Sequence, residues 1–345
     1  MNDRSGNAQR PHVAVIGAGA WGTTLALVSL RAGNATTLVV RGEDALRSFR
    51  DERRHPRSLP GVRIPSALQI ETDATRAITR AGIVILAIPT QKLRAGTAPL
   101  AAALSGKVVV SAAKGIEVAT LSRPTEVVTD VLSGTPARAI CALSGPNLSS
   151  EVASGKPATT VIASHDAGAA GIVQEALMGE AFRVYTSDDV VGVEIGGALK
   201  NIVAIGAGIG DGLGAGDNAK AAFLTRGIAE IARLGIVHGA QPLTFAGLSG
   251  IGDLIATCAS PLSRNHQVGI GLASGKSLPE VLDGMTEVAE GVETTRAAIR
   301  LAHRSGTELP IAEQMHAVLF DGKSPLAAVR DLMIREPTQE LRGML

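Results

Sequence analysis

The stretch VAVIGAGAWG, residues 13–22, is the part of the sequence that decides the fold. A short apolar run leads into glycines at positions 17, 19 and 22, and a helical stretch, residues 23–32, follows directly. In this spacing, Gly17 permits a tight turn, Gly19 lets a pyrophosphate approach the backbone, and Gly22 lets helix and strand pack closely. The helix amino terminus adds N–H donors and a positive dipole. This context predicts a dinucleotide-binding turn, and the alternative is an ordinary strand–helix connection.

Short apolar segments recur outward from this turn and alternate with helical stretches. They are rich in Val and Ile and continuously apolar, as expected of strands that are buried on both faces. The predicted strands are His12–Ile16, Thr36–Val40, Ile83–Ile88, Lys107–Ser111, Ala139–Leu143, Thr159–Ala163 and Arg183–Thr186. Their alternation with helices predicts an α/β fold with a Rossmann-type, doubly wound, mostly parallel sheet.

The pattern changes near Glu194, and beyond it we expect helices only. They are predicted at about residues 194–210, 216–235, 242–258, 263–274, 278–284, 291–305, 311–319 and 325–334. The chain is therefore expected to have a dinucleotide-binding domain, 1–193, and an all-helical substrate-binding and catalytic domain, 194–345. The glycine-rich segment 206–218 is either a hinge or a place where helices pack closely.

Composition narrows the functional class. The chain has 345 residues, 45% hydrophobic and 19% charged, and 33 basic against 32 acidic residues give a formal net charge of +1. This balance, with only 2% aromatic residues, argues against nucleic-acid binding. Cys141 and Cys258 lie far apart in apolar segments, which is typical of buried thiols in a reducing compartment. No stretch resembles a membrane span and no residue cluster indicates a metal, so we expect a soluble, cytoplasmic protein.

Arg41 bears on the choice of cofactor. It follows the second predicted strand, where an NAD-specific site usually carries Asp or Glu against the ribose hydroxyls. A guanidinium there suits the 2′-phosphate of NADP through paired, charge-assisted hydrogen bonds. It can also stack on the adenine or be solvated. The cofactor is therefore NADP or NAD, with NADP favoured by Arg41.

Three ionisable residues lie among small or apolar neighbours. Lys200 is the only charged residue in the stretch 195–210, and Asp253 is the only formally charged one in 234–263. A buried carboxylate needs a partner, and Lys200 would serve. Lys114 lies just beyond the carboxyl end of the predicted strand Lys107–Ser111, at the edge where open α/β sheets bind ligands. Each residue alone could be a packed side chain with its charge at the surface, but together with the glycine turn they indicate a catalytic site.

Longer motifs carry a family resemblance over residues 12–335. They are GAGAWG at 17–22, LPG at 59–61, AIPT at 87–90, AAKGIE at 112–117, LSGPNLSSEVASGKPA at 143–158, ALKNIVAIGAGIGDGLGAGDNAKAAFLTRGIAEIARLG at 198–235, GLSGIGDLIATC at 247–258, SRN at 263–265 and EGVETT at 290–295. In these motifs the chain resembles the bacterial NAD(P)-dependent glycerol-3-phosphate dehydrogenases. The resemblance implies reversible reduction of dihydroxyacetone phosphate at C2, a homodimer, and a role in supplying glycerol 3-phosphate for phospholipid synthesis.

The resemblance also implies roles for single residues. Lys200 is expected to be the general acid/base, with Asp253 as its partner and Lys114 lowering its pKa. The implied substrate contacts are Lys114, Gly145, Asn147, Lys200, Asp253, Ser263, Arg264 and Asn265. The implied cofactor contacts are Gly17, Gly19, Ala20, Trp21, Gly22, Arg41, Lys114, Ser149, Arg264, Val288 and Glu290. The start of a helix at SRN suits a substrate phosphate, and no metal is implied.

One site departs from the family pattern. Ahead of LPG the family usually has Asn, two variable residues and Tyr, and here those positions hold His55 and Ser58. The change bears on adenine packing and on the choice between NAD and NADP. Two other functions stay open at this point: a hydroxy-acid or sugar-acid dehydrogenase with the same two domains, and a protein that binds a dinucleotide without turnover. The presence of Lys114, Lys200 and Asp253 together favours the dehydrogenase of the resemblance.

Overall fold

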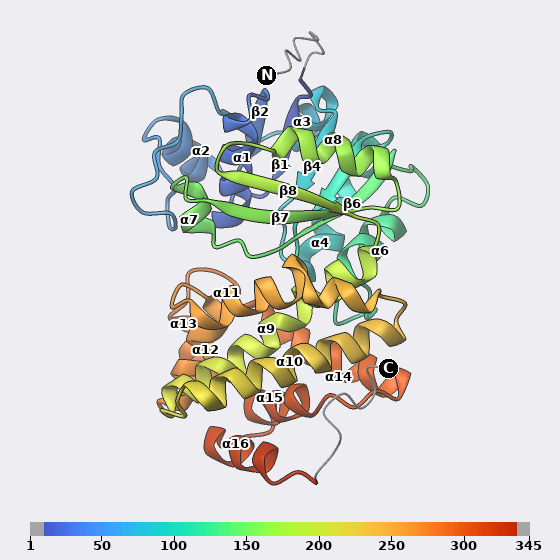
Figure 1. Ribbon diagram of the computed structural model, residues 1–345. Helices are drawn as coiled ribbons and strands as arrows, with labels where there is room; N and C mark the ends of the chain where they lie inside the picture. The colour runs from blue at the N-terminus through green and yellow to red at the C-terminus, as the bar shows by residue number, and fades with distance from the viewer. Residues whose placement is uncertain (1–9, 337–345) are drawn as a thin grey trace.

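The computed structural model describes residues 10–336, and Figure 1 shows a half that contains a sheet above a half made of helices. The ends of the two predicted domains, residues 1–9 and 337–345, lie outside the described residues. Within residues 188–336 every regular element is a helix or a helical turn. The predicted fold class, a Rossmann-type sheet followed by an all-helical part, is confirmed.

An eight-stranded sheet is the centre of the first half. Its order is β3-β2-β1-β4-β5-β6-β7-β8, and each neighbouring pair is parallel except β6 and β7. The strands are β1 (Val13–Ile16), β2 (Thr36–Val39), β3 (Gln69–Glu71), β4 (Ile83–Leu86), β5 (Val108–Ser111), β6 (Ala139–Ser144), β7 (Ala158–Ala163) and β8 (Phe182–Ser187). The predicted segments match all of them but β3, which was missed because it is a short, polar edge strand.

Helices cover both faces of this sheet, which makes it doubly wound. They are α1 (Ala20–Arg31), α2 (Glu43–Arg50), α3 (Ala74–Arg80), α4 (Thr90–Thr97), α5 (Ala101–Leu104), α6 (Pro124–Val131), α7 (Ser149–Ala153) and α8 (Ala167–Leu177), with a short 3₁₀ turn, Ala98–Leu100, before α5. Leu25 of α1 and Val173 of α8 pack in one apolar cluster. Ile78 of α3 and Leu93 of α4 pack in another. The sheet is thus buried on both sides, as its continuously apolar strands predict.

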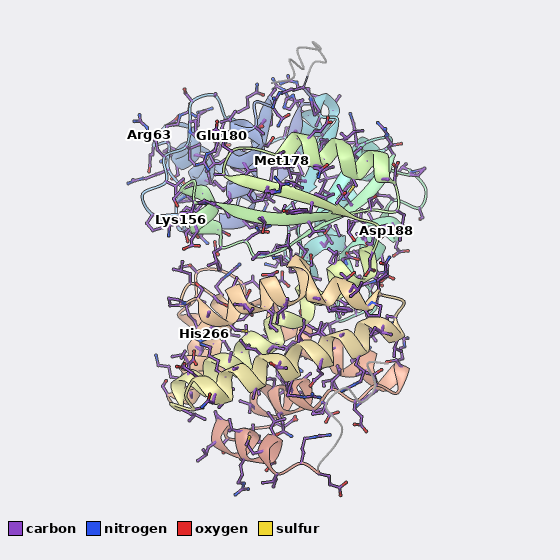
Figure 2. All side chains as sticks on the ribbon, in the orientation of Figure 1. Arg63, Lys156, Met178, Glu180, Asp188 and His266 are labelled. Carbon is purple, nitrogen blue, oxygen red and sulfur yellow. The ribbon has the colours of Figure 1, made fainter. Side chains whose placement is uncertain are left out.

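Helix α9 (Val190–Gly212) begins the second half, and the sequence-based boundary at residues 193/194 lies in its first turn. The Asp189 side chain caps this helix by accepting the N–H of Gly192 at 2.8 Å. The preceding residue, Asp188, is labelled in Figure 2 at the junction of the two halves. The helices that follow are α10 (Asp217–Val237), α11 (Asp253–Ala259), α12 (Arg264–Ala273), α13 (Leu278–Asp283), α14 (Glu290–Ser305), α15 (Pro310–Phe320) and α16 (Pro325–Met333). Helix α9 is long and apolar enough to span a membrane, but 94% of its apolar window is buried inside the protein.

The glycines of segment 206–218 fall into two groups. Within α9, a Cβ at Gly206 would overlap a phenylalanine ring of α10, and a Cβ at Gly208 would overlap a backbone carbonyl of α12. Gly214 and Gly216 have φ of +70° and +82° in the turn between α9 and α10. Close packing therefore accounts for Gly206 and Gly208, and left-handed turn geometry for the two glycines that follow the helix.

The single helix predicted over residues 242–258 is wrong. The segment consists of a 3₁₀ turn (Pro242–Ala246), a π-helical turn (Leu248–Gly252) and then α11. At Gly250 the backbone is not helical, with φ −97° and ψ −106°, and a Cβ there would overlap a neighbouring carbonyl. The break matters for the site because it makes Asp253 the first residue of a new helix.

Candidate active site

Lys200 projects from α9 into a buried cluster of polar groups. Its Nζ donates to Asp253 Oδ1 and to Thr257 Oγ1, each at 2.6 Å, and its side chain is 7% exposed. The small neighbours seen in the sequence explain this burial. A Cβ at Gly197 would lie 2.5 Å from a hydroxyl at the end of β6, and one at Gly196 would lie 2.6 Å from a carbonyl of the π-helical turn. These glycines let α9 approach both the sheet and the segment that carries Asp253.

Asp253 joins two lysines from different parts of the chain. Its Oδ1 accepts from Lys200, and its Oδ2 accepts from Lys114 Nζ at 2.7 Å. Lys114 follows β5 and also donates to the carbonyl of Gly145, after β6, at 2.8 Å. We call Lys114, Lys200 and Asp253 the lysine cluster. With both lysines charged, one carboxylate balances two ammonium groups, so the cluster carries an excess positive charge at the carboxyl edge of the sheet.

Burial and neighbouring charge set the protonation of this cluster. Burial lowers the pKa of Lys200 to about 8, and the Lys114 ammonium lowers it as well, while Asp253 raises it. Burial alone would raise the pKa of Asp253, but the two ammonium groups outweigh it and hold that pKa below its ordinary value. The expected effect of Lys114 on the pKa of Lys200 is therefore present, although burial is the larger cause. Lys200 can gain or lose a proton near neutral pH.

Thr257 completes the contacts of Lys200, and the sequence analysis did not single it out. Its hydroxyl also bonds Asp253 Oδ1 at 3.1 Å, because the two residues lie one turn apart on α11. The one indication in the sequence is that Thr257 follows Asp253, an isolated charge, by four residues. A threonine carries no charge, so nothing else distinguished it within an apolar helix.

Asn201 is a second residue that the sequence analysis missed, although it follows Lys200 directly. Its amide donates to the backbone carbonyl of Lys114 at 3.2 Å, and its Oδ1 accepts from Asn265 Nδ2 at 2.8 Å. The Oδ1 of Asn265 in turn accepts the N–H of Gly291 at 3.0 Å. This chain of amides links the strand end at Lys114 to α9, α12 and α14, and so fixes the lysine cluster relative to the helical half.

The SRN segment lies at the amino terminus of α12, as predicted, but its three side chains have different partners. Ser263 caps the helix by accepting the N–H of His266 at 3.3 Å. Arg264 donates to the carbonyl of Val288 at 2.9 Å, and its side chain is 43% exposed. Asn265 belongs to the chain of amides. Of the three side chains, only that of Arg264 is open to solvent.

The glycine turn between β1 and α1 has the geometry that a dinucleotide needs. Gly17 has φ of +109°, and a Cβ there would overlap a carbonyl at the end of β4. A Cβ at Gly22 would overlap the carbonyl of Gly17, whereas nothing lies within 4 Å of a Cβ at Gly19. Glycine is thus required for packing at positions 17 and 22. Gly19 instead leaves open space in front of the amino terminus of α1.

A carboxylate lies at that helix terminus. The N–H of Ala20 donates to Glu287 Oε1 at 3.2 Å, and the same oxygen accepts from Ser58 Oγ at 2.7 Å. Glu287 Oε2 faces Arg264 Nη1 at 3.3 Å. A carboxylate in this place stands in chemically for a phosphate. Nearby, the buried Trp21 Nε1 has no hydrogen-bond partner among the described residues. An anion site, open space over it and an unpaired indole N–H fit a bound dinucleotide.

Three other predicted cofactor residues surround the turn. Arg41 is exposed after β2, where the adenosine end of a dinucleotide would lie. The carbonyl of Ser149, at the start of α7, accepts from the hydroxyl of Thr24 in α1 at 3.1 Å. Val288 is exposed next to the carboxylate at α1. Among the described residues, we observe no hydrogen bond between these three residues and the lysine cluster.

Glu290 and Asn147 hold parts of the site in place. Glu290 begins α14 and accepts the N–H of Thr90, at the start of α4, at 2.9 Å. Burial raises the pKa of Glu290. Asn147 donates to the carbonyl of Thr159 at 2.8 Å and accepts from Thr160 at 3.1 Å. Both side chains thus connect the sheet edge to neighbouring segments.

His55 and Ser58, at which the sequence analysis expects a departure from the family pattern, form a small structured loop. His55 Nε2 lies 3.1 Å from the carbonyl of Ala18 and donates to it, because Nδ1 accepts the N–H of Ser58 at 2.8 Å. Burial lowers the pKa of His55. Because Nδ1 accepts a hydrogen bond and so carries no proton in this arrangement, the imidazole fixes Ser58 next to the glycine turn.

Comparison with known proteins covers both halves of the chain. Residues 12–170 match the family described as NAD-dependent glycerol-3-phosphate dehydrogenase N-terminus, and residues 189–330 match its C-terminus. A glycerol-3-phosphate dehydrogenase (NAD(P)+) of Thermoanaerobacter sp. is 45% identical over 333 residues, which cover 96% of this chain and 99% of the relative. The enzyme of the same name from Geobacillus thermodenitrificans is 46% identical over 336 residues, covering 97% and 98%.

A solved structure agrees with this similarity. The crystal structure of glycerol-3-phosphate dehydrogenase from Coxiella burnetii has a TM-score of 0.90 and 32% identity, and the match covers 94% of this chain and 99% of that one. The resemblance carried by the sequence motifs is thereby confirmed over nearly the whole length. The chain belongs to the NAD-dependent glycerol-3-phosphate dehydrogenase family.

Proposed function

We propose that this chain is an NAD(P)-dependent glycerol-3-phosphate dehydrogenase, which reduces dihydroxyacetone phosphate at C2 to sn-glycerol 3-phosphate and catalyses the reverse oxidation. The observation that carries the proposal is the buried lysine cluster, at the same edge of the sheet as the glycine turn. Membership of the family narrows the substrate, since relatives at 45% and 46% identity carry this name. A bound nicotinamide ring supplies the hydride in one direction and accepts it in the other.

Lys200 is the proposed general acid and base. An ammonium has three N–H donors, and Asp253 and Thr257 accept two of them, which leaves one for the C2 oxygen of the substrate. As the carbonyl is reduced, negative charge develops on that oxygen and the ammonium donates its proton. Since burial lowers the pKa of Lys200 to about 8, the proton leaves readily near neutral pH. In the oxidation, the neutral amine takes the proton from the C2 hydroxyl.

The other substrate contacts follow from the shape of the cluster. Lys114 supplies a second positive charge, and the loop with Gly145 and Asn147 places it at the strand ends. We place the substrate phosphate at the amino terminus of α12, where Ser263, Arg264 and Asn265 meet the helix dipole. The exposed group there is the guanidinium of Arg264, which suits a phosphate through paired hydrogen bonds.

The cofactor is NAD or NADP, as in the names of the relatives. We assign its pyrophosphate to the turn at Gly17, Gly19, Ala20, Trp21 and Gly22, and its remaining contacts to Arg41, Lys114, Ser149, Arg264, Val288 and Glu290. The exposed guanidinium of Arg41 suits a 2′-phosphate, which favours NADP.

We also infer the cellular setting of the enzyme. Two free, buried cysteines, Cys141 and Cys258, fit a reducing cytoplasm. The family resemblance supports a homodimer, and a role in supplying the glycerol 3-phosphate backbone of phospholipids. Within each subunit, residues 1–193 would bind the dinucleotide and residues 194–345 the substrate.

The test is oxidation of NADH and of NADPH, followed by absorbance, with and without dihydroxyacetone phosphate. We expect oxidation that depends on the substrate, and a panel of keto acids and sugar acids should give little. Arg41→Ala should weaken NADPH more than NADH. Silence with both cofactors, from folded protein that binds a dinucleotide, would contradict the proposal.

A further inference from the structure

Glu287 connects segments that are far apart in the sequence. It lies between α13 and α14, and its side chain is 22% exposed. Its carboxylate contacts the N–H of Ala20 at 3.2 Å, the hydroxyl of Ser58 at 2.7 Å and the guanidinium of Arg264 at 3.3 Å. We call these four residues the Glu287 bridge. Ala20 and Ser58 belong to the sheet half and Arg264 and Glu287 to the helical half, so the bridge crosses between them.

The Glu287 carboxylate occupies the amino terminus of α1, which is a site that favours an anion. Gly19, the N-cap residue of α1, has no side chain and so cannot itself cap the first turn of that helix. The N–H groups and the dipole of a helix terminus attract one anion, and a second anion brought to the same N–H is repelled by the first. A pyrophosphate at the glycine turn and the Glu287 carboxylate would therefore compete for Ala20.

We propose that Glu287 is an internal competitor of the dinucleotide, whose carboxylate occupies the anion site at α1 until the pyrophosphate displaces it. The inference rests on the proposed dinucleotide binding at this turn. Displacement of the Glu287 carboxylate has a second effect, because it releases Arg264 from its ion pair with Glu287. The guanidinium then becomes available to a phosphate group of the cofactor or the substrate.

The proposal also gives His55 and Ser58 a role. Ser58 donates to Glu287. His55 holds Ser58 in position through its Nδ1, and is itself fixed on the carbonyl of Ala18. This loop thus supplies one of the three donors that hold the carboxylate. It would act on cofactor affinity through the bridge rather than by packing on the adenine.

The test measures NADH binding directly. Trp21 is the only tryptophan of the chain and lies next to Ala20, so quenching of its emission, and energy transfer to bound NADH, report on this site alone. Glu287→Gln keeps the shape of the side chain and removes its charge. We expect it to lower the Kd for NADH by about three- to tenfold, the range for loss of a partly exposed ion pair and its repulsion of the incoming anion.

The controls separate the bridge from general effects of charge. Glu293→Gln removes the same charge from α14, where Glu293 pairs only weakly with Arg296 at 3.8 Å, and should leave the Kd unchanged. ADP-ribose, which carries the pyrophosphate without the nicotinamide, should show the same gain as NADH. Ser58→Ala should shift the Kd in the same direction by a smaller factor, and it tests the bridge even where Glu287→Gln does not fold.

The outcomes are distinguishable. Unchanged or weaker binding by Glu287→Gln and Ser58→Ala, with normal binding by the wild type, would overturn the competitor role and leave dinucleotide binding intact. A weaker Kd in particular would mean that the carboxylate assists the cofactor, as a ribose ligand does. No binding of NADH or ADP-ribose by the folded wild type would overturn both the inference and the proposed function.

Discussion

Two opposite charges on helix α9 lie six residues apart and are almost equally buried. Glu194 and Lys200 are each 6% exposed. Glu194 accepts the N–H of Thr125 at 2.8 Å, its hydroxyl at 2.6 Å, and the guanidinium of Arg123 at 2.6 Å. Burial raises the pKa of Glu194, and Arg123 opposes that rise. All these partners sit at the amino terminus of α6, where the helix dipole also favours an anion.

The difference between the two sites lies in how completely each charge is matched. At Glu194 the carboxylate has one guanidinium and two fixed donors, so it has a structural role and needs no ligand. In the lysine cluster, Asp253 balances two ammonium groups, and one N–H of Lys200 stays available. Burial of a charge does not by itself indicate catalysis. The proposed catalytic role of the lysine cluster rests on its unmatched positive charge at the ligand-binding edge of the sheet.

Among changes to the partners of these two charges, Asp253→Asn should have the largest effect. The change leaves Lys114 and Lys200 buried together without an anion and lets Lys200 lose its orientation. We expect kcat to fall about 100-fold or more, equivalent to about 3 kcal/mol of transition-state free energy. Steady-state kinetics measures this, with NADH binding as the control, which should change by less than about twofold. A kcat within about threefold of wild type would contradict the role of Asp253.

Glu194→Ala should affect folding instead of turnover. It leaves the N–H of Thr125 and part of the Arg123 charge without a partner, although Arg123 keeps an ion pair with Glu126 at 2.6 Å. We expect the free energy of unfolding to drop by about 2–3 kcal/mol. Urea unfolding measures it, and Glu126→Ala, at the exposed partner, should cost less than about 1 kcal/mol. A large loss of kcat in the folded Glu194→Ala protein would contradict a purely structural role for Glu194.

A third buried charge, Glu230 of α10, extends the comparison to pH. It accepts the N–H groups of Ile311 and Ala312 at 2.9 Å each, and burial raises its pKa from 4.5 to about 7. The folded state therefore binds more protons than the unfolded state between these values, and stability falls as the pH rises through them. Between about pH 5.5 and pH 8, wild type should lose about 2 kcal/mol relative to Glu230→Gln. Urea unfolding of both proteins at both pH values checks this, and parallel pH dependence would contradict it.

The pH dependence of turnover sharpens the role of Lys200. Because its pKa is lowered to about 8, the neutral amine needed for oxidation of glycerol 3-phosphate is scarce below that pH. The rate of oxidation should rise up to about tenfold per pH unit and level off above about pH 8, and the rate of reduction should fall above it. The measurement is kcat in both directions across this range. Profiles that are flat around pH 8 in both directions would argue against Lys200 as the proton carrier.

Much of the fold was predictable because the central strands are buried on both faces and therefore apolar throughout. Strand β3 escaped because an edge strand with the sequence QIE carries no such signal. The break in the segment 242–258 escaped for another reason. Its hydrophobic residues recur at helical spacing, and the breaks are set by the backbone of the folded chain, which is extended at Gly247 and not helical at Gly250.

The site was predictable to the extent that its residues are conspicuous in the sequence. Lys200 and Asp253 are single charges in long uncharged stretches, Lys114 follows a buried strand, and the structure joins the three by hydrogen bonds. Thr257 is uncharged and gave no such signal. Glu287 lies among other charged residues, and its contact with Ala20 spans 267 positions in the chain, a distance that no local pattern can bridge.

The most direct test of the central claim is the turnover of Lys200→Ala, measured together with NADH binding by Trp21 emission in the same samples. If Lys200 carries the proton, kcat should fall about 1,000-fold or more in both directions, while the Kd for NADH stays within about twofold of wild type. Turnover within about tenfold of wild type, from folded protein that binds NADH normally, would show that another group carries the proton.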